Sequence, residues 1–176
     1  CMKYHPHGDA SIGGALVVLA NRSLFIDKQG NFGNILTGDE ASAARYIECR
    51  ATGLAKDLMY NPDITRYVPS YDGRNKEPTA FRAKLPVVLL MGAEGIAVGM
   101  STYILPHNVK EVIEAEKSCL QGKSFKLYPD FPSGGLVDVS QYADGQGKVL
   151  ARAKLDTSDE KRIVIRELPF GSTTES

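Results

Sequence analysis

Residues 3–20 read KYHPHGDASIGGALVVLA, a polar loop that leads directly into an apolar helical pattern. Pro6 and Gly8 break regular structure, and Asp9 is a residue type that often caps the N-terminus of a helix. Apolar side chains then follow at helical spacing, at Ile12, Leu16 and Leu19. The stretch therefore predicts a loop and then a helix over residues 9–20, with Asp9 as its N-cap.

The next 40 residues predict a loop, a strand and a second helix. Residues 27–38 hold three glycines and two asparagines, which predicts a loop. Residues 45–50 alternate polar and apolar side chains, which predicts a short strand. Its more polar face carries Tyr46, Glu48 and Arg50. A helix over residues 54–59 follows and ends before Pro62.

The middle of the chain is dominated by proline and glycine. Residues 61–86 are rich in proline and charge, which predicts an extended connection with a turn at residues 71–73. The apolar run at residues 87–90 predicts a buried strand. Tight turns are predicted around residues 96–98 by the glycines that surround them, Gly92, Gly95 and Gly99.

The C-terminal part predicts one helix and several strands. Asn108 is expected to cap a helix that runs to about residue 120. Strands are expected at residues 136–139, 147–154 and 162–168. The last two are expected to pair through a turn at residues 156–161. The predicted class is α+β, with domains at residues 1–86 and 87–176.

The composition favours a folded chain without a membrane span. The chain has 176 residues, 43% of them hydrophobic, and no apolar run approaches the ~20 residues that cross a bilayer. The 21 basic and 21 acidic residues cancel, which argues against nucleic-acid binding unless a local arrangement or a further part of the chain supplies positive charge. Cys1, Cys49 and Cys119 lack metal-site spacing and favour a reducing cytoplasm. A start at Cys1 suggests a piece of a longer protein.

The segment HPHGD allows three interpretations. His5, His7 and Asp9 match the HxHxD start of the metal site in metallo-β-lactamase-like hydrolases. That site also needs a histidine after the aspartate, but Ala10 stands there and only His107 remains elsewhere. The histidines can instead be two solvated loop residues, or they can hold a phosphate and move a proton at the mouth of a helix.

Two further segments can carry chemistry or contacts. In the pair Arg45-Tyr46, the tyrosine can be a packing residue or a covalent nucleophile whose phenolate the arginine stabilises. In GAEGIAVGM at residues 92–100, the glycines resemble a loose phosphate loop, but the Gly-Lys-Ser/Thr of such loops is absent. The apolar tip between these glycines suits a wedge pushed into another surface, or ordinary packing.

Taken in order, several segments resemble the A subunits of the bacterial type IIA topoisomerases, DNA gyrase and topoisomerase IV. The matching segments are KYHPHGD at 3–9, QGNFGN at 29–34, DEASAARYIECR at 39–50, YDG at 71–73, KLPVVLLMGAEGIAVGMST at 84–102, PHNVKEVI at 106–113 and DFPSGG at 130–135. The resemblance covers residues 3–150 and weakens after them. It leaves open whether the parent is a gyrase or a topoisomerase IV.

The resemblance implies an ATP-dependent type II topoisomerase that cuts both strands of a duplex, passes a second duplex through the gap and reseals the first. It implies a CAP-like winged-helix domain over residues 1–86, whose helix from Asp9 lies in a DNA groove, followed by the start of an α/β tower domain at residues 87–176. In this family Tyr46 corresponds to the catalytic tyrosine, which forms a 5′-phosphotyrosyl link, and Arg45 to the arginine that assists it.

The resemblance also implies DNA contacts and partners. The DNA-binding positions are Lys3, His5, His7 and Ile96; His7 would also stabilise charge or relay a proton, and Ile96 would intercalate between base steps. Mg²⁺ and ATP would both be bound by the partner B subunit, with no cofactor or metal bound by this fragment. Two A subunits would form a homodimer within a heterotetramer on double-stranded DNA, in the bacterial cytoplasm with the chromosome and away from membranes.

This sequence departs from the family at two positions of the first helix. Members sensitive to fluoroquinolones carry Ser or Thr after HPHGD and an acidic residue four positions later, but this chain has Ala10 and Gly14. Weak drug binding is therefore expected. The fragment alone is expected to be inactive, because the family's segment before Lys3 and its later domains lie outside it. One alternative is a winged-helix DNA-binding module without catalysis, and another is the metallohydrolase at HPHGD.

Overall fold

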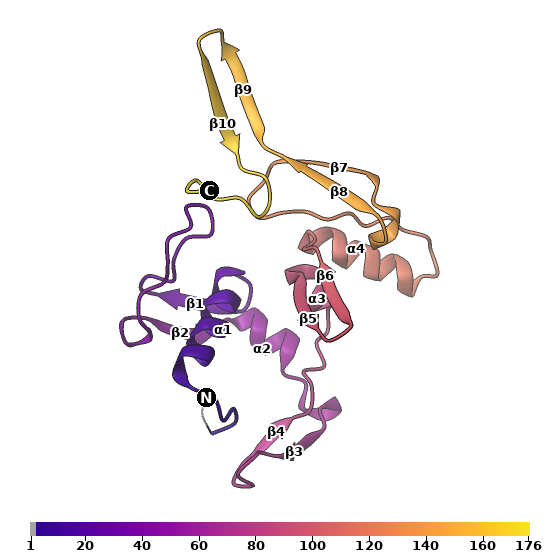
Figure 1. Ribbon diagram of the computed structural model, residues 1–176. Helices are drawn as coiled ribbons and strands as arrows, with labels where there is room; N and C mark the ends of the chain where they lie inside the picture. Colours follow the sequence, from indigo (N-terminus) through magenta and orange to yellow (C-terminus); the bar gives the residue numbers. More distant parts are fainter. Residues whose placement is uncertain (1–2) are drawn as a thin grey trace. The chain divides into compact units, whose positions relative to one another are not determined.

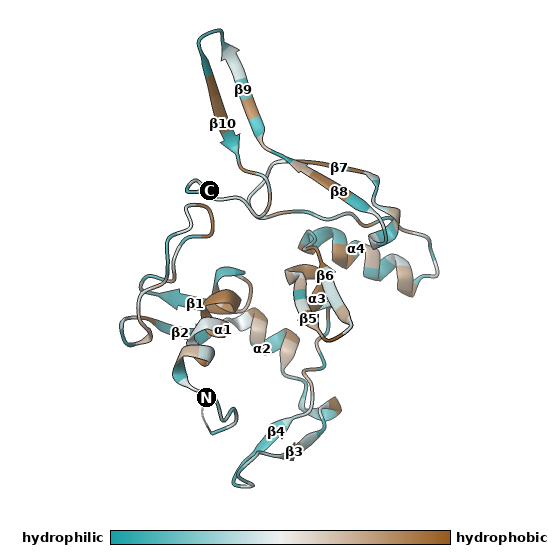
Figure 2. Ribbon diagram, viewed as in Figure 1, coloured by the Kyte–Doolittle hydropathy of each residue, from teal (hydrophilic) through white to brown (hydrophobic). Residues whose placement is uncertain are grey.

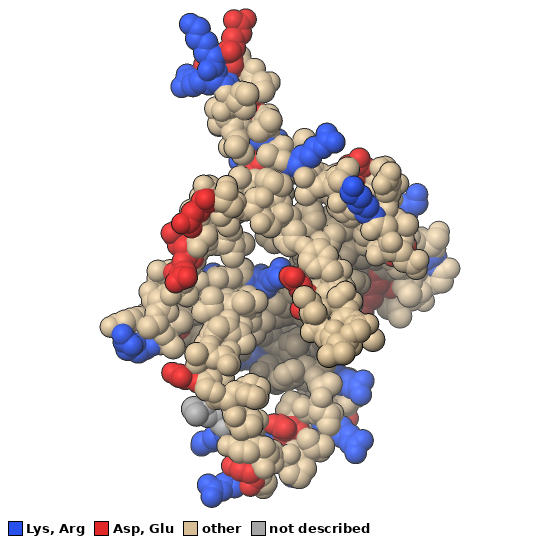
Figure 3. Space-filling view, in the orientation of Figure 1, with Lys and Arg blue, Asp and Glu red and all other residues tan. Residues whose placement is uncertain are grey.

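The computed structural model describes residues 3–176, and Cys1 lies outside the described residues. The chain divides into two compact units, residues 1–85 and 86–176 (Figure 1). Helices alternate with antiparallel strand pairs, which agrees with the predicted α+β class. Over the described residues, the strands form five separate two-stranded sheets. Basic and acidic side chains intermingle on the face shown in Figure 3, as the balanced net charge leads one to expect.

The first helix, α1 (Asp9–Asn21), lies where the sequence predicts it. Its N-cap is Gly8, however, and not Asp9, because Gly8 keeps the extended backbone of a cap residue while Asp9 already has helical geometry. The Asp9 carboxylate still lies in the first turn, where it interacts favourably with the helix dipole. Apolar residues colour much of this helix in Figure 2; Ala20 is buried and Val18 is exposed.

Strands β1 (Ile26–Gln29) and β2 (Glu48–Ala51) pair in an antiparallel ladder from Ile26 with Ala51 to Gln29 with Glu48. The prediction of a loop from residue 27 is thus wrong over its first three residues. The strand that the sequence predicts from residue 45 also starts three residues late, because residues 44–46 form a 3₁₀ helix, η1 (Ala44–Tyr46). Tyr46 therefore does not share a strand face with Glu48 and Arg50.

The rest of the first unit is a short helix and a hairpin. In α2 (Gly53–Met59), the Thr52 hydroxyl caps the helix by accepting a 3.0 Å hydrogen bond from the Ala55 N–H. A 3₁₀ helix, η2 (Pro62–Ile64), leads into β3 (Tyr67–Pro69) and β4 (Lys76–Pro78), which pair with each other. The predicted turn at residues 71–73 is confirmed, but the extended connection around it is a hairpin.

The second unit opens with a single helical turn, α3 (Val87–Met91), where the sequence predicts a buried strand. The carbonyl of Pro86 accepts hydrogen bonds from the N–H groups of Leu89 and Leu90, which closes the turn. The tight turns predicted around residues 96–98 are confirmed only at Val98, since β5 (Ala93–Ala97) and β6 (Met100–Ile104) form a hairpin. Only its tip, at residues 98–99, is a tight turn.

Helix α4 (Val109–Leu120) confirms the predicted cap, because the Asn108 side chain accepts a 3.0 Å hydrogen bond from the Lys110 N–H. Val112, Ala115 and Phe131 are buried in this unit. The strands are β7 (Leu136–Gln141), β8 (Lys148–Arg152), β9 (Lys154–Asp159) and β10 (Arg162–Glu167), with the 3₁₀ helix η3 (Ala143–Gly145) after β7. β8 pairs with β7 and β9 with β10, so the predicted pairing of residues 147–154 with 162–168 is wrong except at Lys154, which begins β9 and pairs with Glu167.

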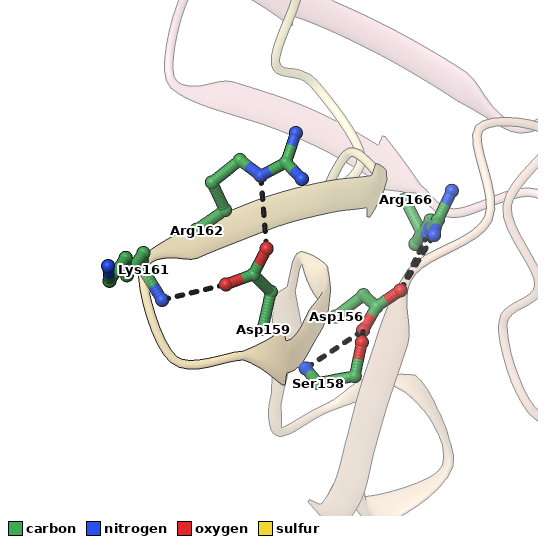
Figure 4. Close-up of polar contacts among 6 residues, drawn as sticks. All are labelled: Asp156, Ser158, Asp159, Lys161, Arg162 and Arg166. Carbon is green, nitrogen blue, oxygen red and sulfur yellow. Dashed lines mark hydrogen bonds and ion pairs between the residues drawn. The ribbon is translucent and has the colours of Figure 1, made fainter.

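Oppositely charged side chains pair along the β9–β10 hairpin (Figure 4). The Asp156 carboxylate accepts hydrogen bonds from the Arg166 guanidinium at 2.7 and 3.1 Å, and also from Ser158. Asp159 pairs with Arg162 at 3.1 Å. Hydrogen bonds from Arg166, and then from Ser158, hold the pKa of the Asp156 carboxyl below its usual range.

Replacing Arg166 with glutamine is expected to raise the pKa of Asp156 towards its ordinary value. A carboxyl group with a lowered folded-state pKa stabilises the fold above its unfolded pKa, about 3.9 for Asp, and this stabilisation disappears as the pH falls through the folded-state value. NMR titration of the Asp156 carboxyl carbon measures the shift. Arg162→Gln is the control, because Arg162 pairs with Asp159 instead. Equal Asp156 midpoints in the wild type and Arg166→Gln would contradict the assignment.

Candidate functional site

Tyr46 lies on a tight turn with its side chain in solvent. The Tyr46 N–H donates a 2.9 Å hydrogen bond to the Ala43 carbonyl, which closes η1. The residue is 67% exposed. The guanidinium carbon of Arg45 lies 4.7 Å from the centroid of the Tyr46 ring. This cation–π contact places a permanent positive charge beside a phenol that incoming ligands can reach.

The chain before Tyr46 is fastened to the glycine-rich segment that follows β1. The Ser42 N–H donates to the Asn31 carbonyl at 3.0 Å. Phe32 in that segment is buried, and its carbonyl accepts a 2.8 Å hydrogen bond from the Asn21 side chain at the end of α1. The turn that presents Tyr46 is therefore connected to the first helix through a hydrogen-bonded loop.

A shallow cleft of about 300 Å³ lies over the β1–β2 ladder, directly after Tyr46 in sequence. Its lining consists of Asp27, Lys28, Gln29, Glu48, Cys49 and Arg50. Two of these side chains are basic and two acidic, and Arg50 pairs with Asp27 at 3.1 Å. The charges offset one another, so this cleft alone does not form an anion site.

The HPHGD loop presents its two histidines to solvent. The rings of His5 and His7 lie 4.2 Å apart between centroids, and the His7 N–H donates to the His5 carbonyl at 2.9 Å. Lys3 is exposed on the same loop. Within residues 3–176, no hydrogen bond, ion pair or ring contact joins either histidine to Tyr46. The structure thus brings Arg45 to Tyr46 but leaves the histidine pair as a separate, accessible group.

The metal interpretation of HPHGD finds no set of converging ligands. Among the residues that the structure describes, no three His, Cys, Asp or Glu side chains lie close enough to hold a metal ion together. The third histidine, His107, is buried in the second unit, where its Nδ1 lies 3.1 Å from the Leu89 carbonyl oxygen. Its Nδ1 thus lies within hydrogen-bonding distance of the backbone of α3, inside the second unit.

Ile96 lies near the end of the β5–β6 hairpin and is 88% exposed. Val98 in the turn and Met100 at the start of β6 are also exposed and apolar. Met100 is not among the site residues predicted from the sequence. The residues on either side of Gly99 could have indicated a hairpin, with Met100 at the start of its second strand. Together the three side chains form a protruding apolar tip that packing within the hairpin does not cover.

Ala10 and Gly14 lie one helical turn apart on α1, and both are exposed. A Cβ atom at Gly14 would have no neighbour within 4 Å. Larger polar side chains could thus be introduced at this face without a clash.

The helices of the described part of the chain include none that is long and apolar enough to cross a membrane.

Comparison with known proteins shows which family this chain resembles. The family model for the A subunit of DNA gyrase/topoisomerase IV matches residues 1–176. The chain is 66% identical over 175 residues to the A subunit of DNA topoisomerase 4 from Borreliella burgdorferi, covering 99% of this chain and 28% of that protein. It is 40% identical to the A subunit of DNA gyrase from Dehalogenimonas lykanthroporepellens, covering 96% and 24%, and 40% identical to that of Helicobacter pylori, covering 96% and 23%.

The chain spans about a quarter of the length of these curated relatives. The match nevertheless runs through the whole chain and includes both the Arg45-Tyr46 turn and the exposed apolar hairpin. This chain therefore belongs to the family of DNA gyrase and topoisomerase IV A subunits.

Proposed function

We propose that this chain is part of the DNA-cleaving A subunit of an ATP-dependent type II topoisomerase, and that Tyr46 attacks the DNA. The observation that carries the proposal is the exposed Tyr46 phenol on a hydrogen-bonded turn with the Arg45 guanidinium 4.7 Å from its ring. A nucleophile for a duplex must be accessible, and a phenol that reacts at neutral pH needs a base or a cation beside it.

The reaction exchanges one phosphodiester for another. The Tyr46 oxygen attacks phosphorus and loses its proton to solvent or a nearby base, while the bond from phosphorus to the 3′ oxygen breaks. The 3′ oxygen leaves with the electron pair of that bond and takes up a proton. The product is a 5′-phosphotyrosyl link, which the 3′-hydroxyl can attack to restore the DNA without new energy input. Arg45 stabilises the negative charge on the phenolate and phosphate oxygens.

The remaining roles follow from the resemblance and the positions of the residues. Residues 1–86 act as a winged-helix domain with α1 in a DNA groove, and residues 87–176 begin the tower domain. Lys3, His5 and His7 contact the DNA backbone from the exposed loop, with His7 also stabilising charge or relaying a proton. Ile96 inserts between base steps, as apolar wedges on DNA-bending proteins do.

The proposed assembly contains two A subunits and two B subunits on double-stranded DNA, in the bacterial cytoplasm. Mg²⁺ and ATP are bound by the B subunit. The metal supplies charge stabilisation at the phosphate and at the leaving oxygen. The whole assembly, and not this chain alone, is expected to cleave DNA.

Reconstitution of the full-length parent with its B subunit tests the proposal. End-labelled duplex DNA and Mg²⁺ are added, the reaction is stopped with detergent, and protein attached to 5′ and 3′ ends is counted. Attachment to 5′ ends only is the expected result. Intact DNA binding without attachment to either end would instead favour the non-catalytic DNA-binding module.

The drug response supplies a separate prediction. Because neither Ala10 nor Gly14 carries a side-chain oxygen, fluoroquinolones are expected to stabilise cleavage complexes of the wild type poorly. The double variant Ala10→Ser, Gly14→Asp places side-chain oxygens at both positions on an open helix face and is expected to trap more cleaved DNA. Titration of drug against cleaved DNA measures this effect. Equal dose–response curves for wild type and double variant would refute it.

A further inference from the structure

Gly30 lies against the backbone of the proposed nucleophile. It follows β1 directly and has a φ of +97°, a conformation that L side chains rarely adopt. A Cβ atom at this position would lie 2.8 Å from the Tyr46 carbonyl oxygen and 3.1 Å from Ile47 Cγ2. Cβ atoms in proteins do not approach a backbone oxygen that closely. Any side chain at position 30 must therefore displace the Tyr46–Ile47 peptide or the turn around Gly30.

The residues on both sides of Gly30 fasten the chain on both sides of Tyr46. Before Tyr46, the Ser42 N–H donates to the Asn31 carbonyl at 3.0 Å. After Tyr46, Glu48 pairs with Gln29 at the end of the β1–β2 ladder. Residue 29 thus pairs with residue 48, residue 30 lies against residue 46, and residue 31 accepts a hydrogen bond from residue 42. This order fixes the backbone of Tyr46 relative to β1.

Backbone position matters more at Tyr46 than at a buried tyrosine. Tyr46 is 67% exposed, so few neighbouring residues pack against it. The position of the phenol oxygen then depends mainly on the position of the Tyr46 backbone and on the contact with Arg45. Misplacement of a reacting group by ~1 Å can slow chemistry on the order of 100-fold.

We infer that Gly30 is a positioning residue for Tyr46: the absence of a side chain there sets where the phenol oxygen stands for attack on phosphorus. This inference rests on the proposed function and adds to it a residue that touches neither DNA nor the reacting atoms. Gly30 would act on the rate of covalent attachment at saturating DNA and would leave DNA affinity unchanged.

Gly30→Ala and Gly73→Ala, each in the full-length parent with its B subunit, test the inference. Gly73 also has a positive φ, +69°, but a Cβ atom there would meet nothing within 4 Å, so its variant carries the conformational strain without the collision. Gly30→Ala is expected to slow single-turnover covalent attachment by roughly 10- to 100-fold, with DNA affinity unchanged, while Gly73→Ala attaches at the wild-type rate. Wild-type attachment by Gly30→Ala, or a loss explained by weaker DNA binding, would overturn the inference.

A DNA substrate with sulfur in place of the scissile 3′ oxygen separates a misplaced nucleophile from a defect in leaving-group activation. Sulfur leaves readily without help, so it rescues defects in leaving-group activation but not a misplaced nucleophile. Gly30→Ala is expected to remain slow on this substrate, and restoration of the wild-type rate would contradict the assignment. If wild type itself forms no covalent link, the proposed function fails, which is a different outcome from a wild type that links and a Gly30→Ala variant that links equally fast.

Asn31→Ala provides a second variant should Gly30→Ala not fold. The Asn31 side chain accepts a 2.8 Å hydrogen bond from the Gly33 N–H, and its removal loosens the same turn without adding an atom. Slower attachment at unchanged DNA affinity is the expected result. Attachment at the wild-type rate would overturn the positioning role of this turn.

Discussion

Replacing Tyr46 with phenylalanine is expected to abolish covalent attachment to DNA while leaving DNA binding intact. The substitution removes only the phenol oxygen, and the ring that contacts the Arg45 guanidinium remains. Without that oxygen no phosphotyrosyl bond can form, so the loss is expected to be on the order of 10⁴-fold or more, as when other covalent nucleophiles are removed. Detergent-trapped cleavage of end-labelled DNA by the full-length parent and its B subunit measures the loss.

Tyr103 offers a matched control for this experiment. It is 65% exposed, close to the 67% of Tyr46, but it lies on β6 in the second unit. Tyr103→Phe is expected to attach at the wild-type rate. Attachment by Tyr46→Phe at wild-type levels would move the nucleophile to another residue, whatever the behaviour of Tyr103→Phe.

Removing the Arg45 side chain is expected to give the second largest effect. Arg45→Ala takes away the positive charge 4.7 Å from the Tyr46 ring, which in the proposed mechanism stabilises charge on the phenolate and on the phosphate oxygens. Loss of one such preorganised donor costs roughly 100- to 1,000-fold in other enzymes. Single-turnover attachment rates at saturating DNA, together with DNA affinity, measure whether chemistry or binding is affected.

Two comparisons define the role of Arg45. Arg45→Lys keeps the charge but loses the planar guanidinium, so an intermediate rate is expected. Arg74→Ala removes a positive charge from the β3–β4 turn of the same unit and is expected to leave the saturated rate unchanged. An Arg45→Ala variant within about threefold of wild type, far short of the effect of losing a charge-stabilising donor, would contradict the proposed role.

Local signals allow the helices with clear caps to be predicted from sequence. Asn108 caps α4 as expected, because its short polar side chain reaches the Lys110 N–H and an amphipathic pattern follows. Helix α1 is predictable for a similar reason, although its cap is Gly8. Such helices can be predicted because the side-chain types and spacings that determine them lie within a few consecutive residues.

Elements whose partners lie elsewhere in the chain could not be predicted in this way. The apolar run Val87–Met91 is compatible with a strand or a helix. It forms a helical turn, which hydrogen bonds to the Pro86 carbonyl close. Strand β1 lies inside a polar, glycine-rich segment and forms because β2 pairs with it. In the same way, β8 pairs with β7 and not with β10, since register depends on neighbours in space.

The same distinction between local signals and partners elsewhere in the chain applies to the candidate site. The Arg45-Tyr46 pair is adjacent in sequence, so its contact follows from the family motif and the local turn. The approach of Gly30 to the Tyr46 carbonyl depends on the pairing of β1 with β2, whose partner residues lie 19 positions or more apart, and nothing in the sequence alone indicates it.

The most direct test of the central claim identifies the amino acid that carries the DNA. Cleavage complexes that the full-length parent forms together with its B subunit on duplex DNA are trapped, the DNA is digested, and peptides are sequenced by mass spectrometry. The account predicts a residual nucleotide phosphate on the peptide containing Tyr46, attached to that tyrosine and to no other. A nucleotide on a different residue, or complete DNA cleavage without any modified peptide, would contradict it.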